Sequence, residues 1–101
     1  MIIENANAKL NIRCPNCKRD SNEYNWSLQT AARFSVGAET CPTLIMVILA
    51  SYNEPDTFAG YRVVCPHCFH GINFEELTLP SDEEILNYAT LVGDNYANMW
   101  L

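Results

Sequence analysis

The chain has 101 residues, of which 49% are hydrophobic and 18% are charged, and its formal net charge is −6 at pH 7. These values indicate a folded protein rather than a disordered one, with room for one core, so we expect a single domain over residues 1–101. No basic segment followed by an apolar one opens the sequence, and the longest apolar run, residues 44–50, cannot span a bilayer, so we expect a cytoplasmic protein with no membrane partner.

The first half of the chain contains three predicted strands. Residues 9–13 alternate polar and apolar side chains, which is typical of a strand. Tyr24, Trp26 and Leu28 also alternate and predict a second strand, which residues 29–34 either continue or follow as a helical turn. Residues 43–49 form an unbroken run rich in branched side chains, and this composition predicts the central strand.

The second half of the chain contains two short predicted strands and a helix. Residues 51–60 are rich in turn formers, and residues 61–64 and 71–74 predict strands. Ser81 followed by three acids is typical of a capping box, so a helix should run from Asp82 to about Val92 and end at Gly93. Its buried stripe should be Ile85, Tyr88, Ala89 and Val92.

Two matching cysteine motifs are the most informative feature. Residues 14–17 read Cys-Pro-Asn-Cys and residues 65–68 read Cys-Pro-His-Cys. Each C-x-x-C can occupy one edge of a metal tetrahedron, and proline sets the turn because its φ is already fixed. The pair therefore predicts one structural Zn²⁺ bound by four thiolates, from Cys14, Cys17, Cys65 and Cys68.

Strand, C-P-x-C and strand, repeated twice, resembles the zinc-ribbon group. The resemblance covers residues 9–20 and 61–74, and it implies that the four cysteines are the zinc ligands. A compact ribbon has about 15–20 residues between its knuckles, whereas here residues 21–60 form a long insertion. The expected fold is a small α+β domain, an elaborated zinc ribbon, in which the zinc organises an antiparallel sheet and a C-terminal helix packs across it.

The cysteine motifs and their neighbours also have alternative interpretations. His70 or Cys41 could replace a cysteine ligand, although Cys41 has no partner two residues on and is typical of a small buried hydrophobe. Residues 65–68 also resemble the active-site tetrapeptide of a thioredoxin-like thiol oxidant, but they follow a strand and have a twin. A catalytic zinc needs an open position, and neither His67 nor His70 begins an H-x-E motif, so we expect no enzyme.

The charge is unevenly distributed, which bears on nucleic-acid binding. Residues 1–62 contain six acids and all six basic residues, whereas residues 63–101 contain six acids and no Lys or Arg. Nucleic acid is densely negative, so the field of the whole chain should repel it. The first knuckle is the exception, because Arg13, Lys18 and Arg19 flank it and are candidate nucleic-acid contacts, with Tyr24 or Trp26 as candidate stacking residues.

The leading functional hypothesis is a non-enzymatic protein that binds a partner protein, as a small inhibitor or regulator of a larger complex. A nucleic-acid-binding ribbon is the alternative, and a thiol–disulfide oxidoreductase is the third hypothesis. The C-terminal segment, residues 81–101, is where we expect the partner surface, unless its apolar end docks on the protein itself. The candidate interface residues are Glu75, Glu76, Glu83, Glu84, Tyr96, Met99 and Trp100.

Overall fold

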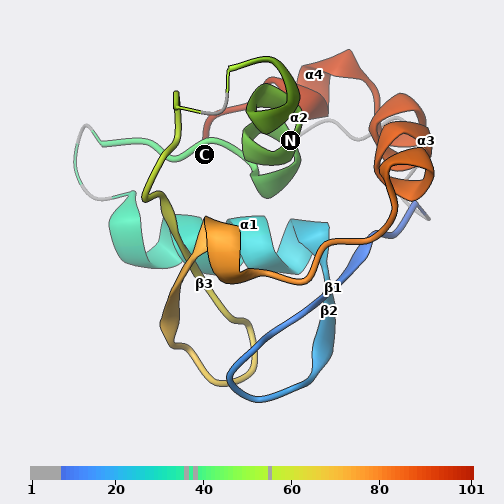
Figure 1. Cartoon of the computed structure of the whole chain (residues 1–101). Helices are drawn as coiled ribbons and strands as arrows, with labels where there is room; N and C mark the ends of the chain where they lie inside the picture. Colours follow the sequence, from blue (N-terminus) through green and yellow to red (C-terminus); the bar gives the residue numbers. More distant parts are fainter. Residues whose placement is uncertain (1–7, 36, 38, 55) are drawn as a thin grey trace.

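Two β-hairpins form one end of the molecule, and α-helices form the other (Figure 1). The computed structural model describes residues 8–35, 37, 39–54 and 56–101. Each hairpin is a separate antiparallel sheet of two strands. The first consists of β1 (Asn11–Arg13) and β2 (Asp20–Asn22), and the second of β3 (Arg62–Val64) and β4 (Gly71–Asn73). The fold is α+β as expected, but the single sheet of the sequence prediction is wrong.

Helix α1 (Glu23–Phe34) begins directly after β2 and lies between the hairpins and the other helices (Figure 1). Its buried residues are Glu23, Trp26, Ser27 and Thr30, which follow the i, i+3, i+4, i+7 spacing of one helical face. The strand predicted around Tyr24 and Trp26 is therefore wrong. Three of the four buried side chains are polar, so an analysis of apolar periodicity alone did not detect this helix.

The apolar run that predicted the central strand forms helix α2 (Leu44–Asn53) instead. Thr43 caps its start by accepting a hydrogen bond from the Met46 backbone N–H at 3.4 Å. Leu44, Ile45, Val47 and Ile48 are all buried, so the helix has core contacts on several sides. A helix that is buried on several sides has no polar face, so its sequence lacks the 3.6-residue spacing of apolar residues. A run of branched apolar residues is then also typical of a buried strand.

Helix α3 (Asp82–Val92) has the bounds and the cap that the sequence predicted. The Ser81 hydroxyl accepts from the Glu84 backbone N–H, as a capping box requires, and Gly93 ends the helix with a φ of 85°. Ile85, Tyr88 and Val92 are buried, and Ala89 is half-buried. A 3₁₀ turn, η1 (Phe74–Glu76), follows β4, and a short helix, α4 (Asp94–Ala97), follows Gly93. In the described part of the chain, no helix combines the length and hydropathy needed to cross a membrane.

The end of the chain docks on the protein itself. The backbones of Leu101 and Cys41 exchange two hydrogen bonds, of 2.9 and 2.6 Å, and the Thr43 N–H donates to the Met99 carbonyl. Tyr96 is fully buried, Met99 is packed against the core, and Trp100 is 50% exposed. Tyr96 is therefore a core residue rather than part of an outer face, and of the three apolar residues expected at the partner surface Trp100 is the most exposed.

A buried carboxylate joins the four α-helices. Glu23 is 0% exposed, and its side chain accepts four hydrogen bonds. Oε2 accepts from the Ser27 hydroxyl at 2.7 Å and from the Ile45 backbone N–H at 2.8 Å. Oε1 accepts from the Tyr88 and Tyr96 hydroxyls at 2.6 and 2.8 Å. One side chain of α1 thereby holds the start of α2 and one tyrosine from each of α3 and α4.

The two tyrosines are well suited to this role. Burial, followed by the charge of Glu23, raises the pKa of Tyr88 and of Tyr96 above its usual range. Both hydroxyls therefore stay protonated at neutral pH and remain available as donors. The start of α2 also stabilises the Glu23 carboxylate, because the N-terminal end of a helix favours negative charge. No described cation pairs with this buried carboxylate, which is stabilised instead by four donors and a helix terminus.

We predict that Glu23→Gln destabilises the protein. The amide keeps the shape of the side chain but removes its charge and directs an NH₂ group at neighbours that donate. The free energy of unfolding should fall by about 2 kcal/mol, measured by urea denaturation of the purified protein. Glu75→Gln, an exposed site on η1, is the matched control and should change it by less than about 0.5 kcal/mol. Equal stabilities of the two variants would show that the buried network contributes nothing.

Candidate metal centre

The two cysteine motifs form knuckles of the same geometry at the turns of the two hairpins. In the first, the Cys14 N–H donates to the Arg19 carbonyl and the Lys18 N–H to the Cys14 carbonyl. In the second, the Cys65 N–H donates to the His70 carbonyl and the Phe69 N–H to the Cys65 carbonyl. The backbone hydrogen bonds of the two knuckles therefore correspond residue for residue, in line with the shared C-P-x-C pattern.

The four sulfurs come together where the two knuckles meet. All four Sγ atoms lie within 4.8 Å of one another. Two of these contacts join different knuckles, with Cys14 Sγ 3.8 Å from Cys68 Sγ and Cys17 Sγ 3.7 Å from Cys65 Sγ. A tetrahedral site with zinc–sulfur bonds of about 2.3 Å has edges of about 3.8 Å between sulfurs. All four cysteines are free thiols, so the cluster could coordinate one metal ion.

Backbone groups in each knuckle are directed at the sulfurs. Cys14 Sγ accepts from the N–H groups of Asn16 and Cys17 at 3.3 and 3.4 Å, and Cys65 Sγ accepts from those of His67 and Cys68 at 3.3 and 3.5 Å. The Asn16 side chain crosses to the other knuckle and donates to Cys68 Sγ at 3.5 Å. Donors of this kind favour thiolate, which is the form that binds a metal. Sequence analysis had assigned Asn16 no role.

Three of the thiols, Cys14, Cys65 and Cys68, differ in how readily they lose a proton. Burial raises the pKa of Cys14 and raises that of Cys65 to about 12. Burial also opposes ionisation of Cys68, but hydrogen bonds from the Asn16 side chain, the His70 backbone and two neighbouring thiols lower its pKa to about 6. A metal bound to all four sulfurs would displace the remaining protons. The donor set, four sulfurs with their own hydrogen-bond donors, fits such an ion.

The two alternative ligands lie outside the cluster. Cys41 is buried, and its backbone pairs with Leu101. The Cys41 thiol lies beside Tyr61, and burial, followed by this thiol, raises the pKa of the Tyr61 hydroxyl above its usual range. His70 lines a hollow between the knuckles together with Arg62 and Asn16, and neither His70 nor Cys41 is among the four clustered ligands. Four cysteines fill a tetrahedron, so neither residue is needed.

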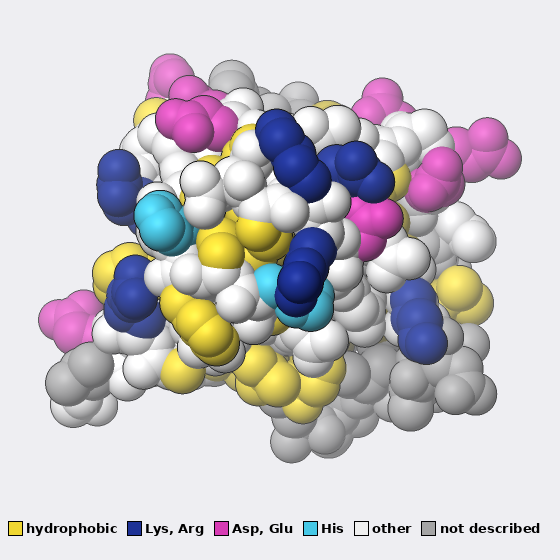
Figure 2. Space-filling model, turned by 90° about the horizontal axis from the view of Figure 1, so that it is seen from below, with side chains coloured by type: hydrophobic (Ala, Val, Ile, Leu, Met, Phe, Trp, Pro, Cys, Tyr) yellow, Lys and Arg dark blue, Asp and Glu magenta, His cyan; other side chains and the backbone are white. Residues whose placement is uncertain are grey.

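The knuckle end of the molecule gathers basic side chains. Figure 2, which views the molecule from below Figure 1, shows Lys, Arg and His side chains grouped around apolar atoms, with most acidic side chains toward the margin. Arg13 pairs with Asp20 at 3.3 Å, the only ion pair found among the described residues. Lys18 and Arg19, the other two candidate nucleic-acid contacts, are exposed beside the first knuckle.

Two further cations, which the sequence analysis did not select, lie beside the second hairpin. The guanidinium groups of Arg62 in β3 and Arg33 in the last turn of α1 approach the same glycine, Gly71. A Cβ built on Gly71 would lie 3.6 Å from the first and 3.9 Å from the second. Phe69 is 51% exposed close to this group. Arg33 and Arg62 are 29 residues apart in the sequence, so only the folded chain shows that they are neighbours.

The acidic candidates for a partner interface do not form one continuous cluster. Glu75 and Glu76 are exposed on η1, whereas Glu83 and Glu84 are exposed in the first turn of α3. Glu84 also accepts a hydrogen bond from the Ser81 hydroxyl. Glu76 lines the hollow that contains Arg62 and His70. The acids therefore belong to two surfaces, and those on α3 are close to the exposed apolar residues of that helix.

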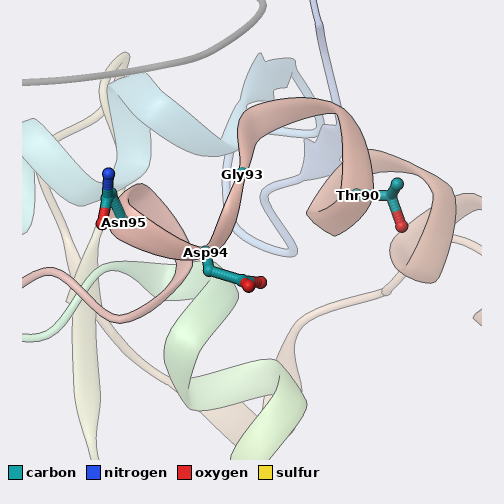
Figure 3. Close-up of a pocket in the computed structure, with 4 residues that line it drawn as sticks. All are labelled: Thr90, Gly93, Asp94 and Asn95. Atoms are coloured by element: carbon teal, nitrogen blue, oxygen red, sulfur yellow. The ribbon is translucent and has the colours of Figure 1, made fainter.

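A hollow of about 460 Å³ lies at the junction of α3 and α4. Its lining consists of Thr90, Gly93, Asp94 and Asn95 (Figure 3). In Figure 3 the side chains of Asp94 and Asn95 point in different directions, and that of Thr90 points away from α4. The hollow thus offers no set of converging groups for acid–base chemistry.

Compared with known proteins, the chain matches no family model, no curated protein and no solved structure.

We predict that the four cysteines bind metal as one unit. Cys14→Ser or Cys65→Ser should abolish binding and unfold the protein, because a structural metal contributes on the order of 10 kcal/mol to folding. The matched control Cys41→Ser should keep one ion per chain. Native mass spectrometry and circular dichroism measure both properties. A folded wild-type chain without metal, or with a Cys14–Cys17 disulfide, would contradict the prediction.

A second prediction concerns the residue after each knuckle. Lys18 and Phe69 adopt φ values of 63° and 60°, a left-handed conformation that costs residues other than glycine about 1–2 kcal/mol. Lys18→Gly should therefore raise the free energy of unfolding by about 1 kcal/mol relative to Lys18→Ala, which removes the same charge but keeps the Cβ. Chemical denaturation of the metal-loaded variants measures the difference. If the alanine variant is as stable as the glycine variant, the strain is relieved in another way.

Proposed function

We propose that the chain is a zinc-stabilised binding protein without catalytic activity, which acts by contact with a partner protein as a small inhibitor or regulator of a larger complex. Zinc is the proposed metal because four thiolates in a tetrahedron are its typical structural ligand set. The observation that carries the proposal is the closed centre. All four positions of a tetrahedron would be filled by protein sulfur, so the ion would have no position for a substrate or an activated water.

The rest of the described chain also favours binding over catalysis. The cysteine motif of the second knuckle lies between two strands rather than at the start of a helix, where a thiol oxidant of the thioredoxin type would have it. Large apolar side chains are exposed on the helices instead: Tyr52, Leu86 and Leu91 are 45%, 54% and 40% exposed. Apolar residues of this size at the surface are typical of interfaces when they occur together.

Affinity capture tests the proposal. The metal-loaded chain, immobilised and exposed to nuclease-treated extract of its native host, should retain a specific protein at stoichiometric amounts, and the Cys14→Ser variant should not. Elemental analysis of the same preparation should find one zinc per chain. Retention of no protein, or retention equal on the unfolded Cys14→Ser variant, would reject the proposal.

Nucleic-acid binding by the knuckle face is the second candidate function. The observation that favours it is the placement of Arg33 and Arg62 near Gly71, at the knuckle end where Figure 2 shows a group of basic side chains, together with the exposed Phe69. Cations around an aromatic side chain suit a single strand, whose phosphates pair with the cations while a base stacks. The capture experiment separates the two candidates, because this function would yield nucleic acid when nuclease is omitted and no specific protein when it is added.

A further inference from the structure

A groove lies between α2 and α3. It is lined by Leu49, Tyr52 and Asn53 from the C-terminal half of α2 and by Asp82 and Leu86 from the start of α3. Its volume is about 520 Å³, within the range of about 300–1,000 Å³ that is usual for ligand sites. Tyr52 and Leu86 are about half exposed, so two large apolar side chains face solvent in one concave site.

One polar contact crosses this groove. The Tyr52 hydroxyl donates to Asp82 Oδ1 at 2.9 Å, which fixes the tyrosine ring against α3. Burial, followed by this hydrogen bond and the negative charge, raises the pKa of the Tyr52 hydroxyl, so it remains a donor at neutral pH. The ring of Tyr52 is held in place before anything binds, which lowers the entropy cost of binding.

Among the described residues, the charged side chain that lines the groove is acidic, and so are its charged sequence neighbours at the end of α2 and the start of α3. Asp82 lies in the groove, Glu83 follows it on α3, and Glu54 follows the end of α2. Neither α2 nor α3 contains a Lys or Arg, and the six basic residues of the chain are at positions 9, 13, 18, 19, 33 and 62. The groove therefore combines apolar surface with negative charge, and it would repel nucleic acid.

We propose that this groove is the docking site for a short segment of the partner protein in which apolar side chains are flanked by Lys or Arg. The inference rests on the proposed function and identifies its partner surface. Charge complementarity selects the occupant, because apolar anchors would enter between Leu49, Tyr52 and Leu86 while the flanking cations lie near Asp82 and the acids beside it. The volume limits the occupant to a few side chains rather than a domain.

Helix α3 supplies a matched pair of leucines for the test. Leu86 lines the groove, whereas Leu91 lies on another face of the same helix and is 40% exposed. Leu86→Ala and Leu91→Ala remove the same atoms from half-exposed positions, so both variants should melt close to the wild type. Asp82→Asn and Glu75→Gln form a second pair, since each removes one negative charge and Glu75 is outside the groove.

The probe is a library of random short peptides displayed on phage and selected on the metal-loaded wild-type chain. Selected peptides should combine large apolar residues with Lys or Arg. Fluorescence anisotropy with the synthetic peptides should show that Leu86→Ala weakens binding by about fivefold or more and Leu91→Ala by less than about twofold. Asp82→Asn should weaken it by about twofold to fivefold and reduce its salt dependence, while Glu75→Gln should not.

Several results would overturn the inference. These are a selection that yields no binder, binders rich in Asp or Glu, or binders affected equally by Leu86→Ala and Leu91→Ala. Self-association of the wild type that Leu86→Ala abolishes in sedimentation experiments would show that the occupant is a second copy of the chain. Failure here is distinct from failure of the proposed function, since a captured partner that binds the Leu86→Ala variant fully would move the interface to another surface and leave the function standing.

Discussion

The contact between four sulfurs from two distant knuckles is the constraint on which the fold depends. Cys14 meets Cys68 across 54 residues, and Cys17 meets Cys65 across 48. Each hairpin has only two strands of three residues, too little to be stable alone. Closing so long a loop costs conformational entropy, and a structural metal can offset that cost with a binding free energy of about 10–16 kcal/mol. Helices α1 and α2 lie within the closed loop, and α1 packs against the joined hairpins, with α2 on α1.

A second constraint acts on the helical half. The Glu23 carboxylate is buried without a cation, and its four donors come from all four α-helices. A buried charge is costly unless its hydrogen-bonding capacity is used. Here each carboxylate oxygen has two donors. An arrangement of the helices that left one of these groups without its hydrogen bond would have a higher free energy. Because α1 also packs on β3, where the Thr30 hydroxyl accepts from the Val64 N–H at 2.9 Å, the network ties the helices to the hairpins.

The charged residues are unevenly distributed over the surface of the protein. Basic residues gather at the knuckle end (Figure 2), where they would offset the negative charge of four metal-bound thiolates, whereas acids occupy the first turn of α3. The proposed protein binding rests on the end where acidic charge and exposed apolar side chains occur together, and the second candidate function rests on the basic knuckle face. A net charge of −6 for the whole chain does not distinguish these surfaces.

The sequence determined the features that depend on local chemistry. Two C-P-x-C motifs specify the knuckles and their sulfur cluster, and Ser81 with Gly93 sets the bounds of α3, because turns and caps are decided by neighbouring residues. Only the tertiary structure decided the rest. Residues 44–53 become a helix because Glu23 and Ser27 satisfy its first N–H groups, and α1 forms because its polar stripe meets donors and acceptors on other elements. A polar side chain can be buried favourably only if groups on other elements form hydrogen bonds with it. The spacing of apolar residues along the sequence does not reveal which groups these are.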